Sequence, residues 1–136
     1  MDISEIKDFP VSSKSLKDIR EFSREVIGKS KILEDSKEEL VLAIAEAAQN
    51  IVKHAYKDNE NTSDRMQIKI LFENNKLEIG FFDKGKPVVK EDIKHRSLDD
   101  IKPGGLGTYF IQQIMDEVVF KKATGWHNNL VLTKKY

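Results

Sequence analysis

The hydrophobic period of this chain switches several times between helical and extended spacing, and this alternation constrains the fold more than any other feature. Residues 3–11 are short and mixed, and we expect an edge strand there, followed by a helix over about residues 12–27. A second helical pattern runs for roughly twenty residues beyond Ser36, which has the spacing of a capping box with Glu39. These patterns predict two helices, the second of them long.

Extended spacing follows. Residues 66–81 alternate apolar and polar side chains on either side of Asn74-Asn75, which predicts a β-hairpin. Residues 83–105 then lose all apolar period and contain two of the three prolines and three of the seven glycines. Because so long an irregular segment in a small domain is usually functional, we expect a lid there.

The last part of the chain returns to regular spacing. Residues 106–115 have a helical period, and 118–122 with 130–133 are expected to close the sheet as a strand pair. The expected order is β, α, α, β, β, long loop, α, β, β. A length of 136 residues fits one domain, so we expect a single domain over residues 1–136.

Composition excludes several classes of protein and of functional site. The 23 Lys and Arg residues balance 23 Asp and Glu residues, so no overall positive field attracts nucleic acid or an anionic membrane, and neither is expected as a partner. The absence of cysteine excludes a disulfide framework, a thiolate nucleophile and the usual zinc site. No export signal or apolar run of membrane-spanning length is found, so we expect a cytoplasmic protein.

The first candidate group lies on the long predicted helix. Glu46, Asn50, Lys53 and His54 follow α-helical offsets that place them on one stripe. The neighbours are so apolar that Glu46 should be partly buried, where a carboxylate needs a partner or a task. A carboxylate beside an amide oxygen suits Mg²⁺, and the carboxylate can also accept a proton. The alternative is a plain salt bridge between Glu46 and Lys53 or His54.

The second candidate group follows the predicted hairpin. Asp83 ends a strand, and Gly85 comes two residues later. Such an aspartate can accept a hydrogen bond from the exocyclic amine of a base, and a glycine lets a planar ligand approach the backbone. An ordinary Asp-x-Gly turn explains the same residues equally well.

The third candidate group precedes the last predicted helix. Residues 103–108 are rich in glycine, and backbone N–H groups at a helix start can face an anion. The segment is not a Walker loop, because Thr108 follows Gly107 where lysine is needed. A flexible hinge is the alternative.

Together, in this order, the three groups resemble the motifs of the Bergerat-fold ATPases, which include gyrase, the mismatch-repair ATPases and the sensor histidine kinases. Residues 46–56 and 104–107, running into 114–118, look most like the bacterial anti-sigma-factor serine kinases. The resemblance covers nearly the whole chain. It implies an α/β (α+β) fold, a two-layer sandwich in which helices cover one face of a mixed, mainly antiparallel sheet. ATP would lie between the long helix and the lid.

The resemblance also implies roles for the residues singled out above. Glu46 would be the general base that activates the attacking hydroxyl, and Asn50 would ligate Mg²⁺. Asp83 would take the adenine amine, with Gly85 beneath the ring. The other residues expected to contact the nucleotide are Lys53, Lys102, Gly104, Gly105, Leu106, Gly107 and Thr108.

Some positions leave choices open. Either Arg96 or Lys102 would supply a cation to the terminal phosphate, as phosphoryl transfer requires. Thr108 would contact a phosphate or cap the helix. Pro87 stands where many relatives carry glycine, which should stiffen the loop. Arg20 matches a basic position that relatives use to touch protein partners.

By resemblance, the protein is expected to be an anti-sigma factor and a serine/threonine kinase. It would bind ATP with Mg²⁺, phosphorylate an anti-anti-sigma protein, and so control the availability of a sigma factor; family members are commonly homodimers. An ATP-gated binding module without kinase activity is the alternative, and a structural domain that has lost ATP is a third possibility. An intact Glu46 favours the kinase, while Asn50, Asp83 and the glycines argue against the third possibility.

Overall fold

The computed structural model describes residues 2–56, 62–86 and 106–136. Its strands are β1 (Ile3–Pro10), β2 (Arg65–Glu73), β3 (Lys76–Asp83), β4 (Glu117–Lys121) and β5 (Asn128–Lys135). Its helices are α1 (Leu16–Ile27), α2 (Lys37–Asn50) and α4 (Leu106–Ile114). Two short 3₁₀ turns, η1 (Ser13–Ser15) and η2 (Glu34–Ser36), precede α1 and α2, and a π-helix, η3 (Ile51–Ala55), continues α2.

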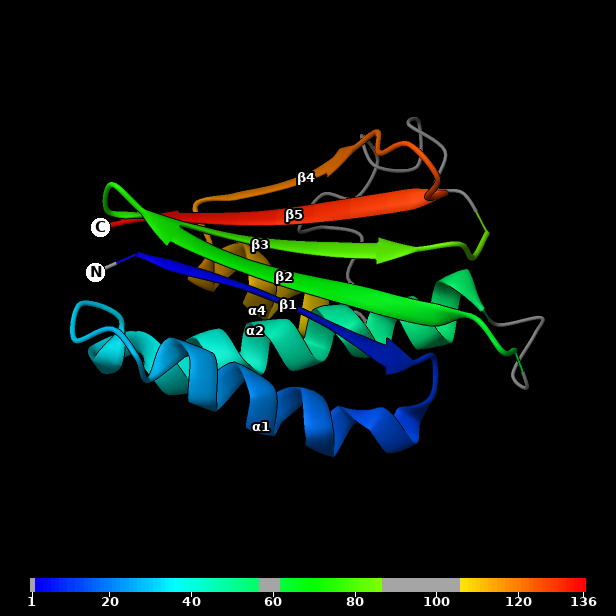
Figure 1. Cartoon of the computed structure of the whole chain (residues 1–136), viewed down its shortest axis with the longest axis horizontal. Helices are drawn as coiled ribbons and strands as arrows, with labels where there is room; N and C mark the ends of the chain where they lie inside the picture. Colours follow the sequence, from blue (N-terminus) through cyan, green and yellow to red (C-terminus); the bar gives the residue numbers. More distant parts are fainter. Residues whose placement is uncertain (1, 57–61, 87–105) are drawn as a thin grey trace.

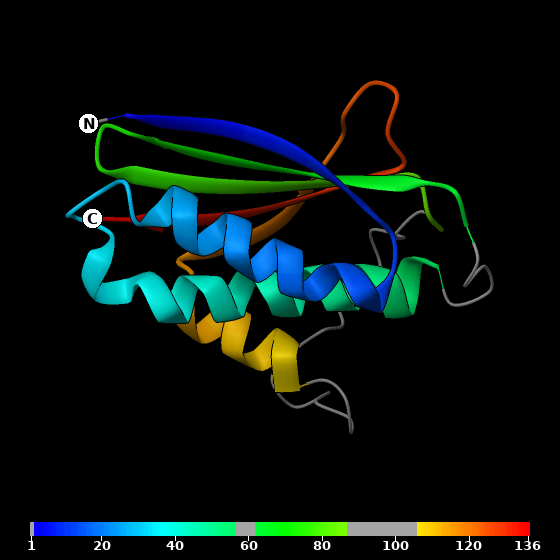
Figure 2. The same ribbon diagram turned by 60° about the horizontal axis from the view of Figure 1, so that its bottom comes forward.

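The strands form one sheet in the order β1-β2-β3-β5-β4, and each of its neighbouring pairs is antiparallel. All three helices lie on the same face of the sheet (Figures 1 and 2). The expected two-layer α/β fold is therefore confirmed. Because β5 lies between β3 and β4, the last strand of the chain sits next to the strand that ends at Asp83.

The core forms where the alternating faces of the strands meet the helices. Ile68, Ile79 and Phe81 of the sheet are fully buried, as are Ile19 of α1 and Ile44 of α2. Burial of such side chains stabilises the fold by about 1.5–3 kcal/mol each, so this layer holds the helices on the sheet. No helix in the described parts of the chain is both long enough and apolar enough to span a bilayer.

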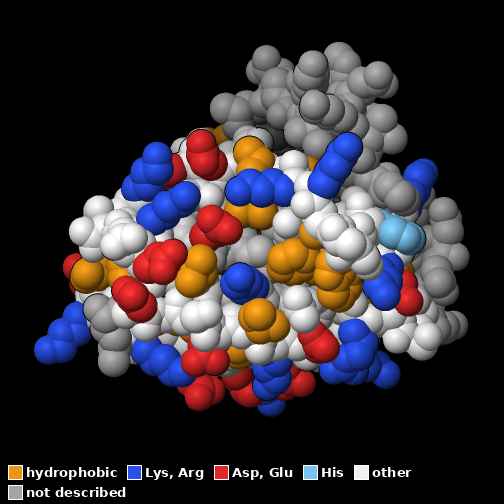
Figure 3. Space-filling view, turned by 45° about the horizontal axis from the view of Figure 1, so that its top comes forward, with side chains coloured by type: hydrophobic (Ala, Val, Ile, Leu, Met, Phe, Trp, Pro, Cys, Tyr) orange, Lys and Arg blue, Asp and Glu red, His pale blue; other side chains and the backbone are white. Residues whose placement is uncertain are grey.

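Among the described residues, the helices leave the other face of the sheet uncovered (Figure 2), and Figure 3 shows the side chains on that face. Lysine, arginine, aspartate and glutamate side chains are interspersed with apolar ones on it. Phe82, which points to this side, packs against Trp126 of the β4–β5 turn with ring centroids 5.7 Å apart. This turn therefore folds back over the end of the sheet.

The hairpin turn follows the sequence prediction closely. Asn74 and Asn75 join β2 to β3 and have φ angles of 53° and 58°. Two successive left-handed residues are what a type I′ turn requires, and asparagine accepts that conformation more readily than most residues. The predicted turn at Asn74-Asn75 is confirmed.

The predicted capping box is wrong. Ser36 is the residue before α2, but its side chain makes no cap hydrogen bond to the helix. Because the chain enters α2 through the 3₁₀ turn η2, the Ser36 hydroxyl instead donates to the carbonyl oxygen of Leu33 at 3.3 Å. It also pairs with the Tyr136 hydroxyl at 2.8 Å.

Candidate functional site

Asp83 is the only buried acidic residue in the described parts of the chain, and the alternation of β3 explains its burial. Leu77, Ile79 and Phe81 point into the core, so Asp83, two residues further on, points to the same side and is 2% exposed. Its Oδ1 accepts hydrogen bonds from Gly85 N–H and Asn128 Nδ2, both at 2.9 Å. Within the described parts of the chain, Oδ2 receives no hydrogen bond, so it remains an acceptor.

Burial raises the pKa of Asp83 above its ordinary value. The hydrogen bonds from Asn128 and Gly85 and the nearby His127 lower this pKa, and Asp64 raises it slightly. Taking a carboxylate out of water opposes folding unless other groups compensate, and groups of this kind concentrate at functional sites. Asp83 is therefore the first candidate for a ligand-binding group.

The turn after Asp83 is fixed against the end of η3. The N–H of Lys86 donates to the carbonyl oxygen of Ala55 at 2.8 Å, and the N–H of Lys84 donates to the Tyr56 hydroxyl at 3.1 Å. The Tyr56 hydroxyl in turn donates to Oδ2 of Asp64 at 3.0 Å. Burial is the main reason that the pKa of Tyr56 lies above its ordinary value.

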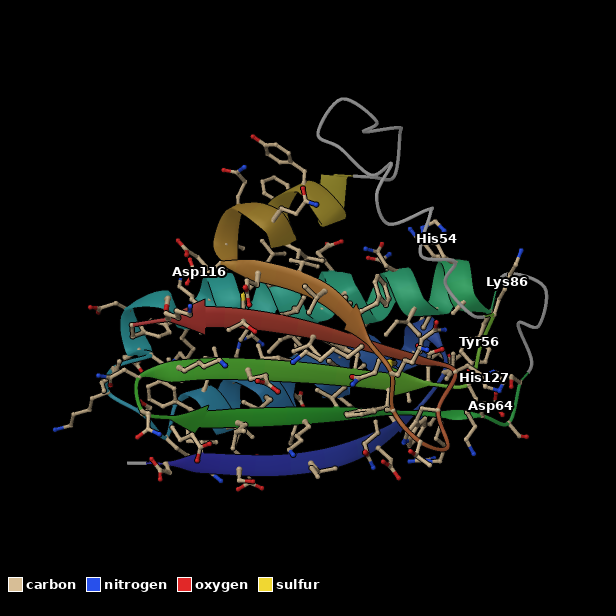
Figure 4. All side chains as sticks on the ribbon, turned by 90° about the horizontal axis from the view of Figure 1, so that it is seen from above. His54, Tyr56, Asp64, Lys86, Asp116 and His127 are labelled. Atoms are coloured by element: carbon tan, nitrogen blue, oxygen red, sulfur yellow. The ribbon has the colours of Figure 1, made fainter. Side chains whose placement is uncertain are left out.

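The β4–β5 turn also contacts the turn at residues 83–86. His127 N–H donates to the main-chain oxygen of Asp83 at 3.0 Å, and its Nδ1 lies 3.1 Å from the carbonyl oxygen of Gly85. Tyr56, Asp64, Lys86 and His127 accordingly gather at one end of the sheet (Figure 4). We call η3 with Tyr56, residues 62–64, residues 83–86, and the β4–β5 turn with Asn128 the Asp83 end.

Gly85 is required at this place by packing. A Cβ there would lie 2.6 Å from Ala55 O, 2.7 Å from Ala55 Cβ and 2.8 Å from Tyr56 Cε2. The side that a Cβ would occupy is thus filled by the end of η3. A base lying against the backbone of Gly85 stays a prediction.

Glu46 and Asn50 lie one turn apart on α2, and both are half-buried, as expected for Glu46. Glu46 lines a hollow of about 280 Å³ between α1 and α2. Arg20 and Arg24 of α1 and Glu38 of α2 line the same hollow. The expected base therefore lies at a surface that another molecule can reach.

Lys53 and His54 belong to the π-helix η3, and both are exposed. A π-helix bonds residue i to i+5 and contains one more residue in its turn than an α-helix. The α-helical offsets behind the predicted stripe therefore apply to Glu46 and Asn50, and a shared face for Lys53 and His54 stays a prediction. Short π segments of this kind are frequent at functional sites.

The third motif is only partly described. Lys102, Gly104 and Gly105, and also Arg96 and Pro87 of the expected lid, lie outside the described residues. Leu106, Gly107 and Thr108 form the first turn of α4, so the helix begins where the sequence predicts. It runs beside α2, beginning on the side of the Asp83 end (Figure 2).

Comparison with known proteins identifies the family of this chain. A family profile described as "Histidine kinase-like ATPase domain" matches residues 9–134. The chain belongs to the histidine kinase-like ATPase family. The resemblance drawn from the motifs is thereby confirmed.

Relatives within the histidine kinase-like ATPase family narrow the comparison. The chain is 37% identical over 101 residues to "Serine-protein kinase RsbW" of Staphylococcus aureus, in strains MSSA476 and JH9 among others. The matched region covers 67% of this chain and 62% of the relative. The chain thus spans somewhat less than two thirds of the length of the curated relatives that it matches.

Four residues at the Asp83 end of this histidine kinase-like ATPase domain were not expected from sequence: Tyr56, Asp64, His127 and Asn128. Their roles depend on strand register, because only the pairing of β3 with β5 places Asn128 opposite Asp83. One weak signal was present. Asn128-Asn129 directly precedes the apolar run Leu130–Leu132, and a buried amide there needs a partner.

Proposed function

We propose that the chain is the ATP-binding kinase domain of an anti-sigma factor, which phosphorylates a serine or threonine of an anti-anti-sigma protein. The observation that carries this proposal is Asp83, a buried carboxylate with Oδ1 occupied and Oδ2 left to accept a hydrogen bond. Membership of the histidine kinase-like ATPase family and similarity to serine-protein kinase RsbW support it.

The spacing along α2 fits a nucleoside triphosphate. The turn of Asp83 contacts Ala55, which is nine residues beyond Glu46 and five beyond Asn50; at up to about 1.5 Å per residue, these separations are at most about 14 Å and 8 Å along the helix axis. An adenine at Asp83 would then extend its phosphates along α2 toward Asn50. The phosphate contacts that we propose are Lys53, Lys102, Gly104, Gly105, Leu106, Gly107 and Thr108, with Lys102 or Arg96 at the terminal phosphate.

The donor set suits Mg²⁺. Asn50 and Glu46 offer an amide and a carboxylate oxygen one helical turn apart. No group of three or more acidic, His or Cys side chains that would hold a metal is found among the described residues. Mg²⁺ usually takes one or two protein ligands and completes its shell with phosphate oxygens and water, so Asn50 is a fitting ligand. When bound, the ion would offset phosphate charge.

Glu46 would act as the base. Its carboxylate would accept the proton of the acceptor hydroxyl as that oxygen bonds to the γ-phosphorus. The bond from the γ-phosphorus to the bridging oxygen would break, and ADP would leave. Because Glu46 lines the open hollow with Arg20, an acceptor protein can approach the base from α1.

We further propose a sigma factor and an anti-anti-sigma protein as partners, a homodimer as the assembly, a single domain over residues 1–136 and a cytoplasmic location. The second candidate function is an ATP-gated binding module. The half-buried Glu46 favours the kinase, because a module that only binds has no use for a base at that position.

The test begins with calorimetric titration of ATP and GTP, with and without Mg²⁺. We then expect Glu46→Gln to keep ATP affinity nearly intact and to lower phosphoryl transfer to a candidate anti-anti-sigma protein by about 10²-fold or more.

Glu38→Gln is the matched control, since Glu38 lines the same hollow and pairs with Arg24 at 3.4 Å. It should leave phosphoryl transfer within about twofold, because an exposed ion pair contributes little. Equal loss of ATP binding and transfer in Glu46→Gln would refute the assignment of the base. Lack of transfer by the unmodified protein, with ATP bound, would favour the gated module.

A further inference from the structure

Asn128 makes the most specific side-chain contact at the Asp83 end. It begins β5, pairs with Asp83 across the sheet, and is 6% exposed. Its Nδ2 donates to Oδ1 of Asp83 at 2.9 Å and to the carbonyl oxygen of Lys86 at 3.0 Å. Both hydrogens of the amide group therefore hold the turn that follows Asp83, one at each end.

We propose that Asn128 is the positioning residue that makes the nucleotide site prefer a 6-amino purine to a 6-oxo purine. The inference rests on the proposed function, because it takes the base to bind at Asp83. It adds a residue through which the choice of base is made.

The first step of the argument is orientation. Asn128 Nδ2 and Gly85 N–H both donate to Oδ1, so the carboxylate of Asp83 is held in one orientation. Oδ2 receives no hydrogen bond in the described parts of the chain, and it is the oxygen left for a ligand. The Gly85 donor is a main-chain group, so of these two hydrogen bonds only the one from Asn128 depends on the identity of a side chain.

The second step is chemistry. An ionised carboxylate only accepts hydrogen bonds, so it pairs with the 6-amino group of adenine and not with a 6-oxo group. A protonated carboxyl would donate from Oδ2 and would accept a 6-oxo purine instead. The preference therefore depends on Asp83 remaining ionised although it is buried.

The third step is the surroundings of Asp83. Burial raises its pKa, and the Asn128 hydrogen bond is the largest influence that lowers it. The titratable groups that face it are Tyr56 of η3, Asp64 before β2 and His127 of the β4–β5 turn, while Lys84 and Lys86 flank it on its own turn. None of these side chains donates a hydrogen bond to the carboxylate.

The experiment compares Asn128→Val with Asn128→Thr, an isosteric pair that differs in one hydroxyl donor. Asn129→Val is the matched control. Asn129 is 8% exposed, lies on the opposite face of β5, and has an Oδ1 without a partner among the described residues. The measurements are calorimetric titrations with the Mg²⁺ salts of ATP and of inosine triphosphate, which has a 6-oxo group, from about pH 5 to about pH 8.

We expect Asn128→Val to lower ATP affinity about tenfold and to reduce the ratio of ATP affinity to inosine triphosphate affinity. We also expect it to raise the pH below which ATP binding is lost. Asn128→Thr should return all three toward the unmodified protein, and Asn129→Val should change none. Thermal unfolding confirms that each variant folds. If Asn128→Val does not, Asn128→Ala takes its place, since it demands no new space.

An unchanged affinity ratio and pH profile in Asn128→Val would overturn the inference. So would equal losses in the valine and threonine variants with the ratio preserved, which indicate a structural role alone. If the unmodified protein binds neither nucleotide, the proposed function itself fails. If the unmodified protein binds ATP but Asn128→Val keeps the same preference for ATP over inosine triphosphate, the proposed function stands and only the role of Asn128 is refuted.

Discussion

At the end of the sheet that carries both termini, which we call the terminal end, Tyr136 N–H donates to Asn75 O at 2.8 Å. There Asp116 accepts from Lys135 N–H at 2.7 Å and is exposed. At the Asp83 end, by contrast, Asp83 is 2% exposed, and its carboxylate accepts a hydrogen bond from Asn128. Bonds at the terminal end fasten strands and leave charge in water. The Asp83 end holds charge in the core, which opposes folding and points to a binding task.

A tyrosine at each end sharpens the contrast. Tyr56 is 4% exposed, and its hydroxyl links Asp64 to Lys84 N–H. Tyr136 is 39% exposed, and its hydroxyl meets only Ser36 among the described residues. Substitutions at the Asp83 end should therefore have larger effects than matched ones at the terminal end.

The largest effect is expected from Gly85→Ala. Its Cβ would overlap Ala55 and Tyr56, so we expect a loss of roughly 2–3 kcal/mol in unfolding free energy. Gly28→Ala, at the C-terminus of α1, would meet one atom below 3 Å, the main-chain oxygen of Arg24 at 2.9 Å, and should cost about 1 kcal/mol, less than Gly85→Ala with its three such contacts. Urea unfolding of both variants measures the difference, and equal losses would contradict it.

Next is the loss of ATP binding in Asp83→Asn. An amide can turn a donor toward the adenine amine, so we expect a loss of roughly 1–3 kcal/mol in binding free energy. The control is Asp116→Asn, which removes an exposed carboxylate from the terminal end and should leave ATP affinity within about twofold. Calorimetry decides; unaltered affinity in Asp83→Asn would move the adenine site elsewhere.

A smaller effect is expected from Tyr56→Phe. It leaves Lys84 N–H and Asp64 Oδ2 without a partner in a half-buried place, at about 1–2 kcal/mol of stability. Tyr136→Phe should change stability by less than about 0.5 kcal/mol, because water replaces its exposed contact. Thermal unfolding at one pH compares the pair. A greater loss for Tyr136→Phe would reverse the contrast.

The smallest effect is a pH dependence of stability. Burial raises the folded-state pKa of Asp83, so ionisation destabilises the fold at neutral pH. This destabilisation is relieved as pH falls from the raised pKa toward the ordinary value of 3.8. Relative to Asp83→Asn, the unmodified protein should therefore gain melting temperature on acidification through that window. A relative decline would mean that the hydrogen bonds to Asp83 outweigh its burial.

The sequence was sufficient for what local periodicity and turn chemistry determine. Alternation predicted the core-facing side of β3, and asparagine at both turn positions predicted the hairpin. Ser36 failed as a cap because a preceding 3₁₀ turn redirected its hydroxyl to Leu33. The roles of Asn128 and Tyr56 could not be predicted from the sequence. They follow from the strand order and from the π-helix that continues α2, which no local pattern specifies.

The central position of β5 has a consequence for biosynthesis. The facing edges of β3 and β4 have no partner until residues 128–135 have left the ribosome. A nascent chain can form the β1–β2–β3 meander early, but it must keep two strand edges open while α4 and β4 are made. Asn128 reaches Asp83 only when that gap is filled. The proposed nucleotide site would therefore mature in the same step that completes the sheet, and under the proposed function a partly synthesised chain would not bind ATP.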